Sequence, residues 1–333
     1  MFSHSPASTR SRFVRLRQVG AALLLGAASL GAHAQWPDKS VQMLLSFPPA
    51  GATDILARAV GQEMSKTLGQ SVVVENKPGA GGNIGLVAAA KAPADGYSIY
   101  MAAVTNAAIA AAAYPPQPAH LLKDFVPIGG VAIVPHMLVV PSSLPVQNVA
   151  QLIALLKAAP GKHNFASQGQ GTLSHLESEL FKAAAGVDIT HIPYKGSSQA
   201  LPDLMAGSSS MMFDSIPASM PHVKAGKLRV LAVASTRRIA MLPDVPTVAE
   251  SGLRGFAADN VFGIMAPKGT PPAAIAGLTR SLRAALDNPE FRQRMQDQGV
   301  ELRFSPADEF AKVVDQEFRT WGRAVEQAKV RLE

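Results

Sequence analysis

Two short segments of the sequence combine glycine with hydroxyl and amide side chains in a way that suits anion binding. The first runs from Phe47 to Asp54 and contains Gly51 and Thr53. Gly51 lets a ligand approach the backbone closely, and Thr53 or Asp54 can cap a following helix. The start of a helix exposes unpaired N–H groups and the positive end of the helix dipole, which together attract an anion. The same residues are equally compatible with an ordinary strand-to-helix turn.

The second segment, 167–172, has the same character. It contains Ser167, Gly169 and Gly171, and it ends at Thr172, which can cap the helix that follows. Two such segments that face each other across a cleft would hold both ends of a small anion through main-chain amides. The occurrence of the pair, rather than either segment alone, indicates an anion-binding cleft.

Other residues offer little for catalysis or metal binding. The histidines beyond residue 35 show no H-E-x-x-H spacing and the chain contains no cysteine, so we expect no metal site. Ser167 does not lie in a G-x-S-x-G elbow. A hydrolase that uses Ser167 and His175 remains the alternative function, although His175 also suits a surface or capping role. Asp214 ends a predicted strand, so it either reaches the cleft or caps the next helix.

A glycine cluster at 79–82 does not predict a dinucleotide site. Ile84 stands where the last glycine of G-x-G-x-x-G should be, and no acidic residue follows at the expected distance. We therefore interpret these glycines as a compact turn and expect no cofactor.

The elements that must position these segments alternate between strands and helices. An apolar strand at 41–45 precedes the first segment, and a helix at 55–68 with one apolar face follows it. The alternation predicts a parallel sheet covered by helices on both faces. Further strands are expected at 71–75, 97–104, 131–140, 164–167, 189–192, 210–213, 228–234, 261–266 and 300–304. Further helices are expected at 84–91, 149–158, 172–185, 199–206, 218–225, 290–298 and 307–329, and from about residues 105 and 271.

Two α/β domains account for this order. Domain 1 is predicted to be discontinuous, with residues 35–133 and 258–333, and domain 2 comprises residues 134–257. The apolar runs at 131–140 and 261–266 are expected to be the only connections, with a ligand cleft between the domains. The proline-rich stretch 113–127 is predicted to be a surface crossing.

Residues 1–34 have the pattern of a secretory signal peptide. Four arginines between Arg10 and Arg17 precede an apolar run, and Ala32-His33-Ala34 forms a small-x-small cleavage site. The mature chain would begin at Gln35 and have 333 − 34 = 299 residues, with a formal charge of 7 − 4 = +3. The basic residues left are scattered, so we expect no nucleic-acid partner. An exported chain without cysteine must be stabilised by its core alone, and we expect a monomer.

The sequence resembles the Bug/TctC family of periplasmic solute receptors of tripartite tricarboxylate transporters. The segment from Phe47 to Asp54 is similar to the family signature F-P-P-G-G-x-T-D, although Ala50 and Ala52 depart from it. The similarity covers essentially the whole mature chain in order, through residues 73–85, 94–97, 167–172, 191–196, 212–214, 225–229, 242–247 and 266–271.

The resemblance implies an α/β, type II periplasmic-binding-protein fold that binds solutes and has no enzymatic activity. Its ligand would be a small carboxylate (a di- or tricarboxylate, an acidic amino acid, nicotinate or an aromatic acid), held by amides, hydroxyls and water. A membrane permease or a sensor protein would be the partner, in the periplasm. The implied ligand-binding residues are Phe47, Gly51, Thr53, Asp54, Thr105, Asn106, Ser167, Gly169, Gly171, Thr172, His175, Asp214 and Phe262.

Overall fold

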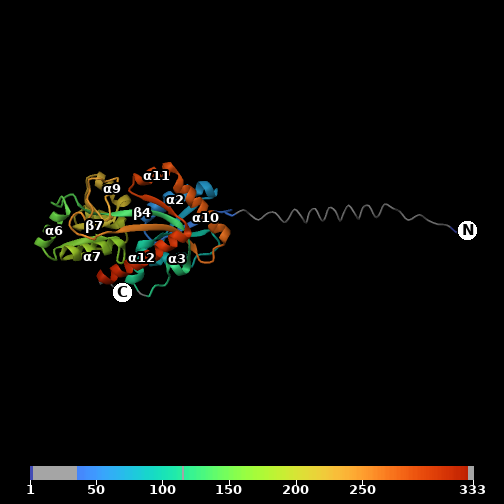
Figure 1. Ribbon diagram of the computed structural model, residues 1–333, viewed down its shortest axis with the longest axis horizontal. Coiled ribbons are helices and arrows are strands. Elements are labelled where there is room, and N and C mark those ends of the chain that lie inside the picture. Colours follow the sequence, from blue (N-terminus) through green and yellow to red (C-terminus); the bar gives the residue numbers. More distant parts are fainter. Residues whose placement is uncertain (3–35, 115, 329–333) are drawn as a thin grey trace. The chain divides into compact units, whose positions relative to one another are not determined.

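A mixed ten-stranded sheet organises residues 39–333 in the computed structural model, which describes residues 1–2, 36–114 and 116–328 (Figure 1). The main strand order is β2-β1-β3-β9-β4-β7-β5-β6, and β8 and β10 both pair with β4. The predicted signal peptide and its cleavage site after Ala34 lie outside the described residues, apart from residues 1–2.

The first half of the sheet is built on β1 (Val41–Leu45), which runs parallel to β2 (Val72–Asn76) and β3 (Ser98–Ala103). β3 then pairs antiparallel with β9 (Asp259–Pro267). Every residue of β3 is buried, as expected for a strand that helices cover on both faces.

One long strand, β4 (Phe125–Pro141), joins the two halves of the sheet. Its first part pairs with β9 and with β10 (Glu301–Ser305), and its second part pairs with β7 (Met211–Ser215) and β8 (Leu228–Val233). The prediction that 113–127 is entirely a surface crossing was therefore wrong from residue 125. Pro127 is accommodated because the β4–β9 register shifts immediately after it, and an irregular position does not need the missing N–H.

The second half of the sheet is built on β5 (His163–Ser167), which runs parallel to β6 (Ile189–Pro193) and to β7. We call β1–β3, β9 and β10 with α2, α3, α10 and α11 the first lobe, and β5–β8 with α6–α9 the second lobe. The helices are α2 (Ala52–Leu68), α3 (Asn83–Ala90), α4 (Val104–Ala113), α5 (Leu121–Asp124), α6 (Val149–Ala158), α7 (Leu173–Ala185), α8 (Ser197–Met205), α9 (Ile216–Lys224), α10 (Pro272–Asp287), α11 (Pro289–Gln296) and α12 (Ala307–Ala328).

Most predicted elements are present, with shifts at their ends. α6 has the predicted bounds, whereas α2 begins at Ala52 rather than at residue 55. The helix can start earlier because Gly51 is extended and lies at the N-cap. The short helix α5 was not predicted. None of the helices in the described part of the chain is long and apolar enough to cross a membrane.

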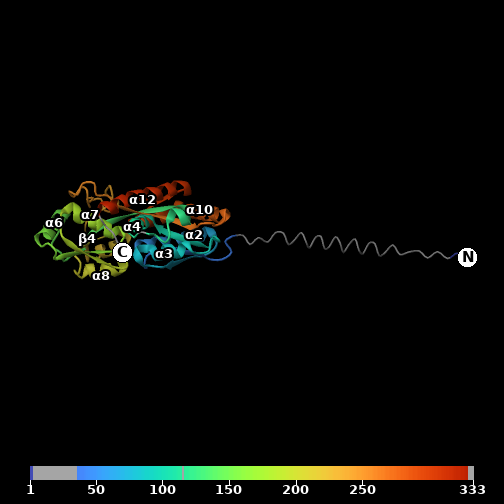
Figure 2. The same cartoon turned by 90° about the horizontal axis from the view of Figure 1, so that it is seen from below.

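In addition to the connecting strands, α4 and α12 link the two lobes. Val104 of α4 and Phe310 of α12 belong to a buried cluster with Leu44 and Met265 of the first lobe. Ile109 of α4 and Trp321 and Val325 of α12 belong to the same buried cluster as Phe165 and Phe213 of the second lobe. Figure 2 shows α12 lying along α4. The two apolar crossings are therefore not the only links, and movement between the lobes must also involve the packing of α4 and α12.

Candidate functional site

The start of α2 presents backbone donors to an enclosed space. Gly51 is the N-cap residue, with φ −85° and ψ 168°, and no side chain in the described part of the protein caps the helix there. Thr53 lies in the first turn, and its hydroxyl has no hydrogen-bond partner among the described residues. Both residues are buried and line the same pocket. Free N–H groups, a hydroxyl and the positive end of the dipole therefore converge on one point.

Asp54 supports this loop from behind. Its carboxylate accepts hydrogen bonds from the Ala50 N–H (3.1 Å), Asn76 Nδ2 (2.9 Å) and Arg58 Nε (3.0 Å). Asn76 Nδ2 also donates to the Phe47 carbonyl at 3.0 Å. Burial raises the pKa of Asp54, but these hydrogen bonds outweigh it and hold the pKa below its usual value. Asp54 thus fixes the loop as an ionised carboxylate and does not line the pocket.

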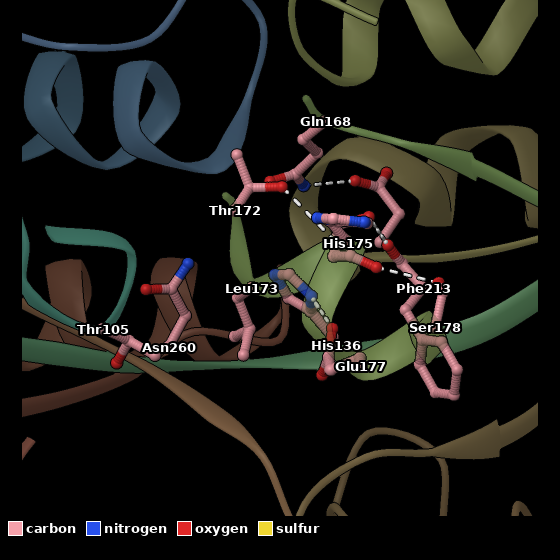
Figure 3. Close-up of polar contacts among 12 residues, drawn as sticks. Thr105, His136, Gln168, Thr172, Leu173, His175, Glu177, Ser178, Phe213 and Asn260 are labelled. Atoms are coloured by element: carbon pink, nitrogen blue, oxygen red, sulfur yellow. Dashed lines mark hydrogen bonds and ion pairs between the residues drawn. The ribbon is translucent and has the colours of Figure 1, made fainter. Parts of the chain in front are cut away.

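The start of α7 differs from that of α2 because most of its backbone N–H groups already donate hydrogen bonds within the protein. The Thr172 hydroxyl accepts from the His175 N–H and donates to the Gly169 carbonyl at 2.7 Å. The Leu173 N–H donates to Asn106 Oδ1 at 2.9 Å, and the Gly171 N–H donates to His175 Nδ1 at 3.3 Å. Figure 3 shows Thr172 and His175 facing each other at this helix start. A ligand therefore finds fewer free amides here than at α2.

Ser167 is directed into the protein. Its hydroxyl lies 2.6 Å from His191 Nε2, accepts the Gly169 N–H, and is fully buried. The rings of His175 and His191 stack at 4.0 Å. Burial lowers the pKa of His175 to about 4, and burial with the nearby His175 and Lys182 lowers that of His191 to about 3. The hydrolase alternative required Ser167 beside His175, but Ser167 is bonded to another histidine and is inaccessible.

Two adjoining pockets lie between the lobes and share Phe47, Pro48 and Gln168. The larger has a volume of about 230 Å³ and extends along the glycine cluster 79–82 to Tyr114 and Lys195. The smaller, of about 20 Å³, is formed by the start of α2 with Asn106, Asn260 and Ser197. We call the two together the cleft.

The lobes touch at the edges of the cleft. A Cβ atom on Gly196 would lie 2.4 Å from Pro48 Cγ, and one on Gly81 would lie 2.9 Å from the Gln170 carbonyl oxygen. Both glycines have positive φ values, 121° and 61°. These contacts leave no room for a side chain at either glycine, so the two lobes lie in close contact at these edges of the cleft.

Hydrogen bonds determine which polar atoms the cleft offers. Asp214 accepts from Gln168 Nε2 (2.6 Å) and Ser197 Oγ (2.7 Å), so it orients two residues that line the smaller pocket. Asn106 accepts from Leu173, so its Nδ2 donates to Asn260 Oδ1 at 3.3 Å. This arrangement leaves Asn260 Nδ2 as a further donor for a ligand.

The predicted ligand-binding residues fall into two groups. Those that line the cleft are Phe47, Gly51, Thr53, Asn106, Gly169 and Thr172. Those that lie behind its walls are Asp54, Thr105, Ser167, Gly171, His175, Asp214 and Phe262. The Thr105 hydroxyl donates to Glu317, and Phe262 is buried in the hydrophobic core. Asp214, in contrast, orients two residues of the cleft.

Sequence reasoning missed several cleft residues. Gln168 lies within the second glycine segment, and Lys195 and Ser197 follow β6, so their position after parallel strands was a usable signal. The glycine cluster 79–82 was interpreted only as a turn, yet it forms a wall of the larger pocket. Asn260 lies on antiparallel β9, where no local pattern marks it.

A family model described as the tripartite tricarboxylate transporter family receptor matches residues 56–330. The chain belongs to this receptor family. BugT of Bordetella pertussis is 37% identical to the receptor over 298 residues, which cover 89% of this chain and 91% of BugT.

Two solved structures are similar over nearly their whole length. An R. palustris protein solved with adipate has a TM-score of 0.84 and 34% identity, covering 88% of this chain and 98% of that one. MatC of Rhodopseudomonas palustris, with bound malate, has a TM-score of 0.82 and 30% identity, covering 87% of the receptor and 100% of MatC. The predicted family and periplasmic-binding-protein fold are confirmed, and the receptor is a solute-binding protein rather than an enzyme.

Proposed function

We propose that this receptor captures a small dicarboxylate in the cleft and that one carboxylate lies against the start of α2. The uncapped start of α2 carries this proposal, since its N–H groups adjoin the Thr53 hydroxyl in a buried pocket. Asn260 Nδ2 adds a donor from the crossing strand β9. These neutral donors suit a carboxylate, and the ligands of the adipate and malate complexes support that class.

The second carboxylate would occupy the larger pocket. Lys195 lines it from the second lobe and is exposed, so its ammonium group stands at the outer end of the cleft. A volume of about 230 Å³ favours a small ligand over a drug-sized one. A ligand with two carboxylates would therefore bridge the lobes, and a monocarboxylate would engage mainly α2.

Calorimetry with adipate, malate, glutamate and nicotinate tests this function, with adipamide as the neutral control. We expect saturable binding of a dicarboxylate and binding of adipamide weaker by a factor of about ten or more, because the amide carries no charge. A ligand at about 100 times its Kd should add roughly 2.7 kcal/mol to the free energy of unfolding.

The substitution Lys195→Gln tests the contact of the second carboxylate separately from that of the first. It should lower the affinity for adipate by about two- to fivefold and leave the affinity for hexanoate unchanged, since an exposed ion pair contributes little. Lys224→Gln, at an exposed position on α9, is the matched control. Equal affinity for adipate and adipamide would contradict the proposal.

We further propose export to the periplasm with cleavage after Ala34, a monomeric receptor, and delivery of the ligand to a membrane permease or a sensor protein. We retain residues 35–133 with 258–333 and residues 134–257 as the two domains. The proposed boundaries fall within β4 and just before β9, the strands that pass between the lobes. Mass spectrometry of the periplasmic protein should give a chain that begins at Gln35, and an uncleaved cytoplasmic product would contradict export.

A further inference from the structure

A second cavity lies between the loop that follows β8 and the segment from α11 to β10. Its volume is about 560 Å³, larger than either pocket of the cleft and within the range of small-molecule sites. It shares no lining residue with the cleft. Residues 237–243 of the second lobe and 292–302 of the first form its walls, with Pro135 of β4 between them. We call it the rear cavity.

The rear cavity has apolar walls and a basic rim. Ile239, Met241 and Leu302 supply apolar surface from both lobes. Arg237 and Arg238 lie on the rim, but each has a carboxylate partner. Arg237 pairs with Glu301 at 3.2 Å and Arg238 pairs with Glu250 at 2.9 Å, so these four side chains largely neutralise one another.

Arg292 is different because its charge is not neutralised. Its guanidinium donates to the Leu286 carbonyl at 3.0 Å and to the Leu302 carbonyl at 3.5 Å. Among the described residues it has no carboxylate partner. The two carbonyls hold the guanidinium in place at the cavity wall, and its remaining N–H groups stay available to an anion.

We propose that the rear cavity binds a small amphiphilic carboxylate, with its apolar body against Ile239, Met241 and Leu302 and its carboxylate on Arg292. A purely apolar ligand would leave the guanidinium unused, and a cation would be repelled by it. A planar guanidinium matches a carboxylate through two parallel hydrogen bonds. This site is independent of the proposed cleft ligand, because the two share no residues.

Titration of the full chain with naphthalene-2-carboxylate tests the proposal, with calorimetry as the readout and 2-hydroxymethylnaphthalene as the neutral analogue. We expect saturable binding of the carboxylate and binding of the alcohol that is weaker by about two- to fivefold, because Arg292 is exposed and an exposed ion pair contributes little. Arg292→Gln should weaken binding of the carboxylate by about the same factor. Arg319→Gln, an exposed arginine on α12, is the matched control and should leave its affinity unchanged.

Two further variants make the result decisive. Gly51→Leu adds a side chain at a residue that lines the smaller pocket of the cleft and not the rear cavity, so it should leave this binding intact. Ile239→Glu puts a carboxylate in the cavity wall and should weaken binding even if Arg292→Gln fails to fold. The proposal is overturned if Gly51→Leu abolishes binding while Arg292→Gln and Ile239→Glu do not. Equal losses in Arg292→Gln and Arg319→Gln, or linear uptake without saturation, would overturn it as well.

Discussion

The starts of α2 and α7 resemble each other in sequence and differ in what they offer a ligand. Each follows a parallel strand, contains glycine and carries threonine. At α7 the Thr172 hydroxyl, Asn106 and His175 already satisfy the donors. At α2 none of the described side chains caps the helix, and Asp54 is hydrogen-bonded to the loop behind it. A helix start is therefore an anion site only where the protein leaves its N–H groups unpaired.

The largest expected effect comes from blocking the start of α2. Gly51→Leu should lower affinity for the cleft ligand by about a hundredfold or more, because Gly51 lines the small pocket and the new side chain would compete with the ligand for that space. The backbone there has φ −85°, which leucine adopts without strain, so the melting temperature should change little. Calorimetry and thermal unfolding measure the two quantities. Unchanged affinity would show that the ligand does not approach α2.

A pair of hydroxyl deletions compares the two helix starts directly. Thr53→Ala removes a free donor to a charged ligand, worth about 1.5–3 kcal/mol, so affinity should fall roughly ten- to hundredfold. Ser167→Ala removes the partner of His191 and the acceptor of the Gly169 N–H. It should therefore reduce stability by about 1–3 kcal/mol and affect affinity less. Urea unfolding and calorimetry distinguish these outcomes, and the reverse pattern would contradict the assignment.

Acid should loosen the start of α7 before the start of α2. The His175 pKa is lowered by burial from about 6.5 to about 4, so its contribution to stability is complete above pH 6.5 and is lost as the pH falls toward 4. The Asp54 pKa is lowered, so that carboxylate stays ionised at pH 5. Between pH 7.5 and 5, the wild type should lose about 1–2 kcal/mol more stability than His175→Gln.

Urea unfolding at the two pH values measures this difference, and His222→Gln on α9 serves as the control histidine. The amide resonance of Gly171, which donates to His175 Nδ1, should shift on acidification while that of Ala50 stays in place. Equal losses in the wild type and in His175→Gln would show that protonation of His175 is not the cause.

The smallest effect concerns backbone strain in the first loop. Ala50 has φ 65°, a left-handed conformation that costs a non-glycine residue about 1–2 kcal/mol. In the loop before α7, residues 167–172, the positions with positive φ are Gly169 and Gly171. Ala50→Gly relieves the strain but adds about 0.5–1 kcal/mol of unfolded-state entropy, so a gain of up to about 1 kcal/mol is expected. Thermal unfolding measures it, and a loss of stability would show that Ala50 is unstrained.

The sequence alone determined most of the secondary structure, because a helix or a strand depends mainly on residues that are close together in the chain. The apolar run at Val41–Leu45 and the periodicity of α6 predicted elements that the structure contains. The glycine segments marked both helix starts, since glycine and threonine have local backbone preferences. Family-specific motifs along the chain also predicted the fold and the solute-binding function.

Only the tertiary structure decided which atoms face the cleft. Ser167 turned inward because His191, from the neighbouring strand β6, lies within hydrogen-bond distance. Asn106 satisfies α7 from the other side of the cleft, and Asn260 reaches the pocket from β9. Such contacts join residues far apart in the chain, so no window of sequence contains both partners. The rear cavity could not be predicted from the sequence for the same reason. Its walls come from both lobes, so the cavity exists only when the two lobes pack together.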